Sequence, residues 1–396
     1  MMKTVETFSF EGKRALIRVD YNVPLDESYV IQDDSRMTAS LPTIQKVLSE
    51  GGSVVLMSHL GRPKNGPESK FSLQHLVSNL EALTGTNVIF SDDCISQDAI
   101  NTSKNLKVGT IHLLENLRFY KEETNGDNEF AKTLSQHGDI YVNDAFGTAH
   151  RSHASTAVIA NHFQDKCFGY LMTKEIQNAS MLLKDPKRPF TAIVGGAKVS
   201  DKILIIRNLL NIADHIIIGG GMAYTFKCAQ GGTIGNSLFE EERVETCREI
   251  LEEAKEKNVK IHLPQDSVIA DNFDNKANTQ NCQSDQIPEE WMGLDIGKNA
   301  IIAFTKVLAQ SKTILWNGPM GVFEMSSYEN GTKSVAEAVA KATANGAFSL
   351  IGGGDSSAAV KKFKYTDQVS YVSTGGGALL EYFEGKKLPG IVAIEG

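Results

Sequence analysis

Short apolar runs rich in β-branched residues alternate with amphipathic segments along the whole of the 396-residue chain. Such alternation is typical of βαβ units, in which parallel strands are buried beneath helices on both faces of a sheet. The sequence therefore predicts an α/β fold built from doubly wound parallel sheets. The expected strands are Ala15–Asp20, Val54–Ser58, Val88–Phe90, Ile111–Leu114 and Ile140–Asn143, then Thr191–Val194, His215–Ile218, Lys260–Leu263, Thr313–Trp316, Phe348–Ile351 and Val369–Ser373.

The length of the chain predicts two or three domains, and the strongest boundary signal lies between Phe168 and Pro189. Residues 171–183 have the composition of one helix, and two prolines follow it within six residues. A helix that ends in Asp185-Pro186-Lys187-Arg188-Pro189 would act as a semi-rigid hinge between two sheets. Further helices are expected over Leu41–Leu48 and Glu240–Lys257, where apolar residues recur at helical spacing.

Charge and cysteine content exclude several classes of protein. The formal net charge is -8, so the chain lacks the basic field that favours nucleic acid or anionic membrane. The five cysteines form no CxxC pair, which argues against a zinc site or a disulfide framework and fits a reducing compartment. No apolar run approaches the ~18 residues that a membrane helix needs, and the first residues lack a signal-peptide core. We therefore expect a cytoplasmic protein without nucleic-acid or membrane partners.

Polar and cationic residues follow the strands of the first half. Ligands of open α/β sheets bind outside the carboxyl ends of the strands, so these exits are where chemistry is expected. Arginine pairs bidentately with carboxylates and phosphates, and several arginines together predict a pocket for a small, multiply anionic molecule. The exits are Asp20-Tyr21-Asn22, His59-Leu60-Gly61-Arg62, the segment ending at Arg118 and the segment from Asn143 to Arg151, and Arg36 lies at the start of the next helix.

Glycine follows the strands of the second half. Glycine between a strand and a helix lets the backbone approach a ligand closely, and the helix N-terminus then presents free N–H groups to phosphate. Asp355 comes directly after three glycines, where a hard carboxylate oxygen could hold Mg²⁺. These exits predict a nucleotide-binding half. They are Gly195-Gly196, Gly219-Gly220-Gly221, Gly352-Gly353-Gly354 and Gly375-Gly376-Gly377.

Simpler interpretations apply to single features. One arginine at a strand end is most often a solvated surface charge, and one glycine pair is usually a turn or a helix C-cap. His150 and His153 have a spacing that can bind metal, but the sequence supplies no further ligand near them. No GxxxxGK[ST] and no GxGxxG occurs, so P-loop and standard dinucleotide folds lose support. Two other functions are compatible with these features: a nicotinamide-dependent dehydrogenase and a catalytically idle nucleotide-binding scaffold.

The motifs between Arg18 and Glu381 resemble those of the phosphoglycerate kinase family, in the family's order. Two departures are visible: Lys298 stands where the family commonly has proline, and Tyr224 replaces a common phenylalanine. Neither position carries a charge in the expected mechanism. The matching segments are RVDYNVP, DDSRMTASLPTI, SHLGRP, LENLRF, NDAFGTAHRSHAS, GGAKVSDKI, GGGMAYTF, WMGLDIG, WNGPMGVFE, IGGGDS and STGGGALLE.

This resemblance implies a phosphotransferase with a carboxyl group as acceptor, and assigns roles to individual residues. The reaction would be reversible phosphoryl transfer between 1,3-bisphosphoglycerate and MgADP, giving 3-phosphoglycerate and MgATP in glycolysis. The triose-acid site would contain Asp20, Tyr21, Asn22, Arg36, His59, Leu60, Gly61, Arg62, Arg118 and Arg151. The nucleotide site would contain Lys202, Gly293, Asn317, Glu324, Gly353, Gly354, Asp355 and Ser356, with Asp355 holding Mg²⁺. The catalytic residues would be Arg36, Lys198, Gly354 and Gly376.

The resemblance also implies a domain arrangement. Two Rossmann-like domains would be joined by a hinge helix, with residues 1–170 binding 3-phosphoglycerate and residues 171–376 binding the nucleotide. Residues 377–396 would pack back on the first domain. The expected partners are small molecules only, and the family expectation is a monomer.

Overall fold

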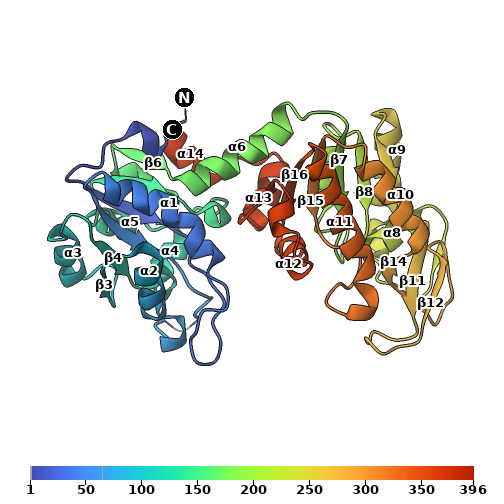
Figure 1. The fold of residues 1–396 in the computed structure, drawn as a ribbon, viewed down its shortest axis with the longest axis horizontal. Coiled ribbons are helices and arrows are strands. Elements are labelled where there is room, and N and C mark those ends of the chain that lie inside the picture. The colour runs from blue at the N-terminus through green and yellow to red at the C-terminus, as the bar shows by residue number, and fades with distance from the viewer. Residues whose placement is uncertain (1, 65) are drawn as a thin grey trace. The chain divides into compact units, whose positions relative to one another are not determined.

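The computed structural model describes residues 2–64 and 66–396, which form two compact units. Unit 1 comprises the chain up to Gln177 together with Lys387–Gly396, and unit 2 comprises Asn178–Lys386. The division falls inside helix α6 (Tyr170–Lys184), which covers the expected hinge helix (Figure 1). The C-terminal helix α14 (Pro389–Glu395) belongs to unit 1, where the amide of Gly390 donates to the carbonyl of Ala149.

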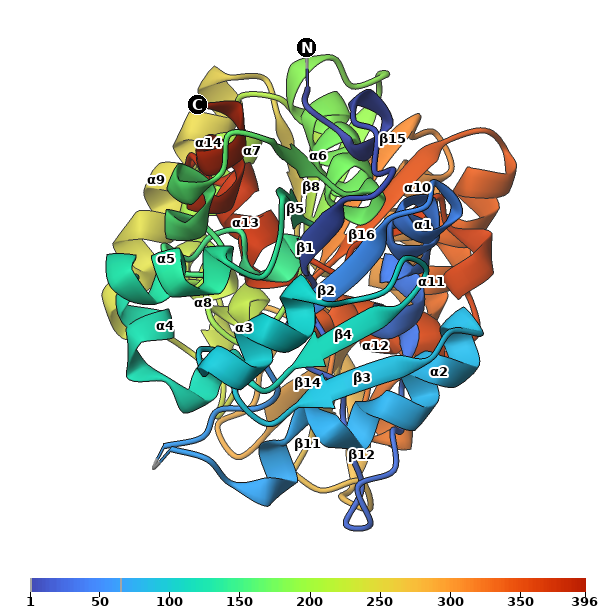
Figure 2. The ribbon, with the colours of Figure 1, turned by 90° about the vertical axis from the view of Figure 1, so that its left-hand side faces the viewer.

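Unit 1 is built on a six-stranded, wholly parallel sheet in the order β3-β4-β2-β1-β5-β6 (Figure 2). This confirms the predicted doubly wound parallel sheet. Strand β6 was not expected, because three residues are too short a run to show any apolar pattern. The strands are β1 (Arg14–Arg18), β2 (Ser53–Met57), β3 (Val88–Ser91), β4 (Ile111–Leu114), β5 (Ile140–Asn143) and β6 (Lys166–Phe168).

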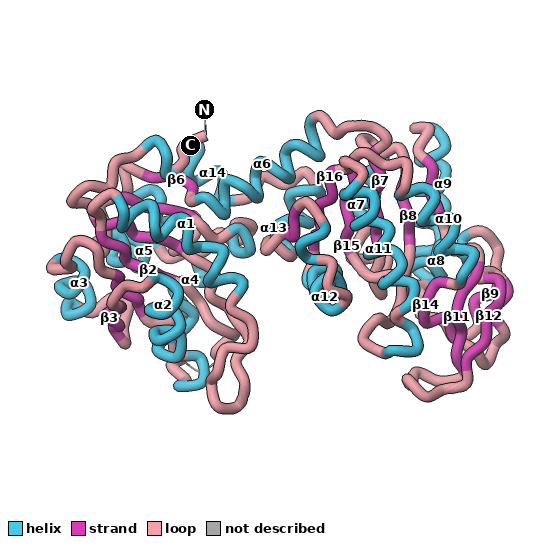
Figure 3. The backbone as a smooth tube through the Cα atoms, viewed as in Figure 1, coloured by secondary structure: helices cyan, strands magenta, loops and turns pink. Residues whose placement is uncertain are grey.

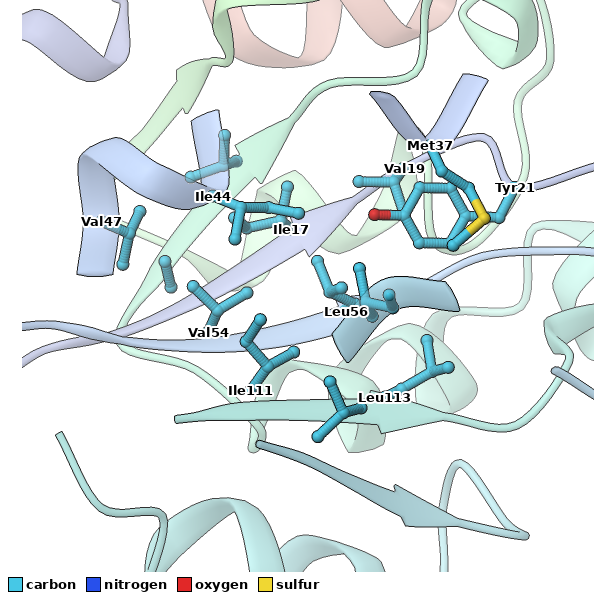
Figure 4. Close-up of a cluster of buried hydrophobic side chains, with 14 of the residues drawn as sticks. Ile17, Val19, Tyr21, Met37, Ile44, Val47, Val54, Leu56, Ile111 and Leu113 are labelled. Carbon is cyan, nitrogen blue, oxygen red and sulfur yellow. The ribbon is translucent and has the colours of Figure 1, made fainter. Parts of the chain in front are cut away.

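Helices cover both faces of this sheet. Helix α1 (Ser35–Ser49) buries Ile44 and Val47 against one face, where Ile17 and Leu56 lie (Figure 4). Helix α2 (Val77–Thr84) adds Leu80 to the same cluster. Successive strand residues point to opposite faces, so their neighbours pack beneath the remaining helices. Those are α3 (Gln97–Lys104), α4 (Lys121–Asn125) and α5 (Asn128–Ser135), joined by short 3-10 turns.

Unit 2 repeats the architecture with the strand order β10-β8-β7-β15-β16-β17, again wholly parallel. Helices α10, α11 and α12 pack on one face of it around Phe304, Trp316 and Val339. The strands are β7 (Phe190–Val194), β8 (His215–Ile218), β10 (Lys260–His262), β15 (Thr313–Asn317), β16 (Phe348–Gly352) and β17 (Tyr371–Val372). The helices are α7 (Ile203–Leu209), α8 (Met222–Ala229), α9 (Val244–Glu256), α10 (Lys298–Leu308), α11 (Asn330–Ala344), α12 (Gly354–Lys362) and α13 (Gly377–Phe383).

Two small sheets extend unit 2, and the sequence did not predict them (Figure 3). One is antiparallel, with β11 (Asp266–Ala270) between β12 (Thr279–Gln283) and β14 (Met292–Ile296). The other pairs β9 (Thr233–Ile234) with β13 (Gln286–Ile287). Strand β12 is mostly exposed and polar, so it lacks the apolar pattern by which the other strands were found. Within the described residues, no helix is long and apolar enough to span a membrane.

A buried histidine pair lies between the sheet of unit 1 and α3. The Nε2 atom of His137 lies 2.9 Å from the carbonyl oxygen of Cys94, which can only accept, so Nε2 carries the proton. Nδ1 of His137 then accepts from the Ser103 hydroxyl at 2.6 Å, and Ser103 accepts from Nδ1 of His112 at 2.8 Å. Nε2 of His112 is left to accept from Ser91 at 2.8 Å. Both imidazoles are therefore neutral, with opposite tautomers.

This pair should make unit 1 sensitive to acid. Burial lowers the pKa of His112 and of His137 to about 4, from an ordinary value of 6.5. The unfolded chain therefore takes up these protons first, and the stability that the neutral pair contributes is present above pH 6.5 and lost as the pH falls toward 4. The loss can reach about 3 kcal/mol for each imidazole.

We expect His112→Asn to flatten the pH dependence of unfolding, because the amide keeps a donor near Ser103 but cannot take up a proton. The measurement is the free energy of unfolding by urea between pH 7 and pH 4.5, roughly the range in which these imidazoles titrate. His162→Asn is the matched control, since this histidine is only partly buried and bonds to Asn128 outside the pair. A slope equal in all three proteins would show that the buried pair does not determine acid sensitivity.

Candidate functional site

The predicted acid-binding residues of unit 1 follow adjacent strands. Strands β4, β2, β1 and β5 are neighbours, and parallel strands end at the same edge of a sheet. Asp20 follows β1, His59 follows β2, Arg118 follows β4 and Arg151 follows β5. Arg36 reaches the same edge from the first turn of α1. The structure therefore collects these side chains at one end of the sheet, as the strand-exit argument requires.

Asp20 links several of these groups. Its carboxylate forms an ion pair with Arg36, and His59 Nδ1 lies 3.7 Å away. Burial favours the neutral carboxyl, but Arg36 and Arg18 outweigh it and hold the pKa of Asp20 below its usual value. Burial and the guanidinium groups of Arg18, Arg118 and Arg36 lower the pKa of His59 to about 3. His59 is therefore neutral at physiological pH and can offer a hydrogen bond but not a charge.

Tyr21, Asn22, Leu60 and Gly61 shape the backbone at this edge. The side chains of Tyr21 and Leu60 lie in the core, so only their backbone groups can face a ligand. The Tyr21 hydroxyl lies 2.9 Å from the Ser40 hydroxyl inside unit 1. Asn22 joins two exits, because its Oδ1 accepts from the amide of Gly61 at 2.8 Å.

Arg18 is a buried residue of this site that the sequence analysis did not select. It ends β1 with no exposed surface, and its guanidinium lies 3.3 Å from His59 Nδ1. Its Nε donates to Ser155 at 2.9 Å, and Ser155 donates to the buried Glu123 at 2.6 Å. A charged residue at the end of an otherwise apolar strand was the signal that could have identified it, since buried charges are usually paired.

The other arginines leave cationic groups available. Burial and the positive charges of the nearby Arg18 and Arg62 lower the pKa of Arg118. These guanidinium groups therefore lie close enough together to repel one another. Nε of Arg118 is buried without a hydrogen-bond partner among the described residues, which favours a ligand acceptor at this position. Arg62 and Arg151 are exposed. This end of unit 1 can thus hold a small molecule with several negative charges.

The glycine exits of unit 2 surround a cavity of about 330 Å³. Strands β7, β15 and β16 are neighbours, so their exits lie side by side. Gly353 has φ of +91°, and a Cβ there would lie 2.6 Å from Nδ2 of Asn317, so only glycine fits. Helix α12 begins at the next residue, with its N-terminus at the cavity. The predicted residues that line the cavity are Lys198, Lys202, Asn317, Gly353, Gly354, Asp355, Ser356 and Gly376.

Three hydrogen bonds fix the polar groups of this cavity. Lys202 donates to Oδ1 of Asn317 at 2.6 Å, while Nδ2 of Asn317 donates to the carbonyl of Gly352 at 2.8 Å. Burial lowers the pKa of Lys202, and Asp201 and Asp355 oppose that shift. The Ser356 hydroxyl accepts from the amide of Gly318 at 2.6 Å. The cavity therefore presents ammonium groups and free backbone N–H groups, a combination suited to phosphate.

A second cavity of about 420 Å³ shares Gly196, Ala197 and Asp355 with the first. It contains the predicted residues Gly293 and Glu324. Its walls are mainly apolar, and the residues that sequence reasoning missed are Tyr224, Leu238, Phe273, Met292 and Leu294. Tyr224 lies on α8, Met292 and Leu294 lie on β14, and Leu238 and Phe273 lie in loops. These positions are far apart in the sequence, so their common chamber becomes visible only in the folded structure. An apolar chamber that continues into a cationic one has the form needed by a nucleotide.

Tyr224, the departure from the common phenylalanine, is anchored at the wall of this chamber. Its hydroxyl donates to Ser267 at 3.1 Å, and Ser267 lies 2.8 Å from the hydroxyl of Ser284. A Cβ on Gly293 would come within 1.9 Å of the tyrosine oxygen, so the ring lies directly against that glycine. The extra hydroxyl is thus satisfied within the protein.

His150 and His153 do not gather further metal ligands. Nδ1 of His153 lies 3.8 Å from Glu123, and burial, Arg118 and Arg18 lower its pKa to about 4. Across residues 2–64 and 66–396, no group of three or more His, Cys, Asp and Glu side chains could hold a metal ion by itself. These histidines instead border the arginine cluster of unit 1.

Comparisons with known proteins agree with this geometry. The family model described as phosphoglycerate kinase matches residues 5–386. The chain is 52% identical to a phosphoglycerate kinase of Porphyromonas gingivalis, over 99% of this chain and 100% of the relative. It is 50% identical to the enzyme of Chloroherpeton thalassium, over 99% and 98%. The solved phosphoglycerate kinase of Coxiella burnetii superimposes with a TM-score of 0.90 at 41% identity, covering 100% and 99% of the two chains.

The resemblance inferred from the motifs is confirmed over nearly the whole chain, and the dehydrogenase alternative is excluded by it. Full-length identity of about half, an equivalent fold and a family match that spans both units lead to one conclusion. The chain belongs to the phosphoglycerate kinase family.

Proposed function

We propose that unit 1 binds the triose acid and unit 2 binds the nucleotide in the phosphoryl transfer of the phosphoglycerate kinase family. The observation that carries this assignment is the contrast between the two strand edges. Arginines gather at the edge of unit 1, whereas glycines, lysines and an adjoining apolar chamber occupy the edge of unit 2. A small acid needs charge alone, but a nucleotide needs a surface for its base as well as groups for its phosphates.

On the acid side, Arg36, Arg62, Arg118 and Arg151 would bind the carboxylate and phosphate of 3-phosphoglycerate. Arg36 is paired with Asp20, which keeps the guanidinium near the binding edge. Backbone groups of Tyr21, Leu60 and Gly61 would face the ligand, together with the side chains of Asp20, Asn22 and His59. Guanidinium groups suit this task because their donors match carboxylate and phosphate geometry.

On the nucleotide side, the base would lie in the apolar chamber beside Gly293, and Glu324 would accept hydrogen bonds from the ribose hydroxyls. Lys202, Asn317 and Ser356 would bind the phosphates together with the backbone N–H groups of α12. The two chambers share Asp355, so base and phosphate sites are contiguous.

The chemistry requires cations rather than a general base. The nucleophile is a phosphate oxygen of ADP in one direction and a carboxylate in the other, and both are anionic near neutral pH. Catalysis is then alignment and neutralisation of the transferring group. We assign Lys198 and Arg36 to that group, with the N–H groups of Gly354 and Gly376 stabilising charge that develops on it.

Asp355 is the residue that would hold Mg²⁺. It supplies one hard carboxylate oxygen beside the phosphate cavity, and Mg²⁺ is commonly held by one or two carboxylates together with substrate phosphates. The residues present therefore fit the ion. When bound, Mg²⁺ neutralises charge on the nucleotide phosphates.

We also propose that the protein is a cytoplasmic monomer. All five thiols are free, which suits a reducing compartment. The monomer is carried over from the family resemblance, and light scattering coupled to gel filtration would test it.

Replacing Lys198 should separate catalysis from binding. If its ammonium stabilises the transferring group mainly in the transition state, Lys198→Ala should lower kcat by about 10²–10³ and leave KM for both substrates little changed. The measurement is a coupled assay with 3-phosphoglycerate and MgATP, run with and without a chelator. If the variant loses only affinity for a substrate, the lysine is an anchor in the ground state and the catalytic assignment is wrong.

Replacing Asp355 should change the response to metal. Asp355→Asn removes the negative oxygen but keeps the shape, so the Mg²⁺ concentration for half-maximal rate should rise about tenfold or more. The same titration on Asp201→Asn is the control, because Asp201 lines the phosphate cavity without following the glycine triplet. An unchanged Mg²⁺ titration for Asp355→Asn would remove this residue from the metal site.

A further inference from the structure

We propose that Lys362 is a positioning residue for nucleotide binding, which fixes the loop that carries Glu324 at the wall of the apolar chamber. The inference rests on the proposed role of Glu324 toward the ribose. Lys362 lies near the end of α12, whose first turn carries Asp355. It lies outside the residues that line either cavity and outside the matched site motifs.

One ammonium group makes several contacts with the loop that follows β15. Nζ of Lys362 donates to the carbonyl oxygen of Phe323 at 2.7 Å and pairs with Glu329 at 2.7 Å. It also lies 5.9 Å from the ring centroid of Phe323 and 5.5 Å from that of Phe363. An ammonium group carries three N–H donors and a positive charge that attracts aromatic faces, so a single lysine can make the hydrogen bond, the ion pair and the ring contacts at once.

The contact with Phe323 controls the direction of Glu324. The carbonyl of Phe323 and the amide of Glu324 form one planar peptide, so holding that oxygen also fixes the plane that leads into the next residue. The Phe323 side chain is buried, with 5% of its surface exposed, whereas Glu324 is exposed at the cavity. The loop thus has a fixed inner residue and a free carboxylate, and Lys362 acts on the bond between them.

Helix geometry connects this contact to the phosphate site. Asp355 and Lys362 are seven residues apart, about two helical turns, so both lie on the same face of α12. Asp355 borders both cavities, and Glu324 borders the larger one. The N-terminus of α12 would therefore position the nucleotide phosphates, and its C-terminal part would position the Glu324 carboxylate that binds the ribose. One rigid helix would keep the phosphate site and the ribose site at a constant separation.

A purely stabilising ion pair is the simpler explanation for Lys362. The side chains of Lys362 and Glu329 are 38% and 25% exposed, and such pairs contribute little to stability. A stabilising role would change the melting temperature but not the discrimination between nucleotides. A positioning role changes that discrimination, because Glu324 would no longer lie where the ribose hydroxyls are.

The test compares kcat/KM for ATP and for 2′,3′-dideoxy-ATP, which lacks both ribose hydroxyls. We expect the wild-type protein to prefer ATP by about tenfold or more, as a charged hydrogen-bond acceptor would give. Lys362→Met should reduce this preference to about twofold, with KM for 3-phosphoglycerate unchanged. Lys362→Arg, which keeps donors for the carbonyl, should restore most of it. Lys362→Leu, which also lacks a donor for the Phe323 carbonyl, serves in the same comparison if the methionine variant does not fold.

Two controls separate the parts of the arrangement. Glu329→Gln removes the ion pair but leaves the bond to Phe323, so it should keep the preference for ATP. Lys341→Met removes an exposed lysine that pairs with Glu337 on α11, and it should also leave the preference unchanged. Equal losses in Glu329→Gln and Lys362→Met would overturn the role of the carbonyl contact.

Glu324→Met, which removes both acceptor oxygens, tells failure of this inference from failure of the proposed function. If Glu324→Met loses the preference for ATP but Lys362→Met keeps it, Lys362 does not position the loop, and the ribose assignment stands. If Glu324→Met keeps the preference, the ribose assignment is wrong and the inference about Lys362 is overturned with it.

Discussion

Parallel strands bring all of their carboxyl ends to one edge of a sheet, and both units of this protein depend on that constraint. In unit 1 the edge must hold several positive charges close together, which costs electrostatic free energy unless buried partners compensate. Glu123 and Ser155 supply that compensation for Arg18, and Asp20 supplies it for Arg36. In unit 2 the strand exits are rich in glycine, so backbone N–H groups can approach a ligand closely and fewer charged side chains are needed than in unit 1.

The two sheet edges offer different groups for binding anions. Guanidinium groups carry charge and fixed donor geometry, so they bind a small anion that has no other feature to recognise. In the proposed nucleotide site, backbone N–H groups and two lysines would bind the phosphates, and the adjoining apolar chamber would add a surface for the nucleoside. Asp355 and Lys362 lie on one face of α12, and we propose that the helix links those two parts of the nucleotide site.

Strand alternation and strand-exit composition predicted both large sheets and the residues that the structure gathers at their edges. Arg36 and Arg118 could be foreseen because they begin a helix or follow a strand, whereas Lys202 and Asn317 were expected from the family resemblance alone. Residues that act through distant contacts could not. Lys362 is recognisable only from its contact with the loop after β15. Arg18, by contrast, had a sequence signal, a charge at the end of an apolar strand, whose importance is explained by its hydrogen bond to Ser155 and, through Ser155, to Glu123. The sheet of β11, β12 and β14 was missed because its polar edge strand carries no apolar alternation.

Calorimetric titration of each substrate separately tests the assignment of one substrate to each unit. The account predicts that Arg62→Ala weakens 3-phosphoglycerate binding about tenfold or more and leaves Kd for MgADP nearly unchanged. Lys202→Ala should show the reverse, because its ammonium lies among the glycine exits of unit 2. If either variant weakened the other unit's ligand by a similar factor, the division of the two substrates between the units would be contradicted.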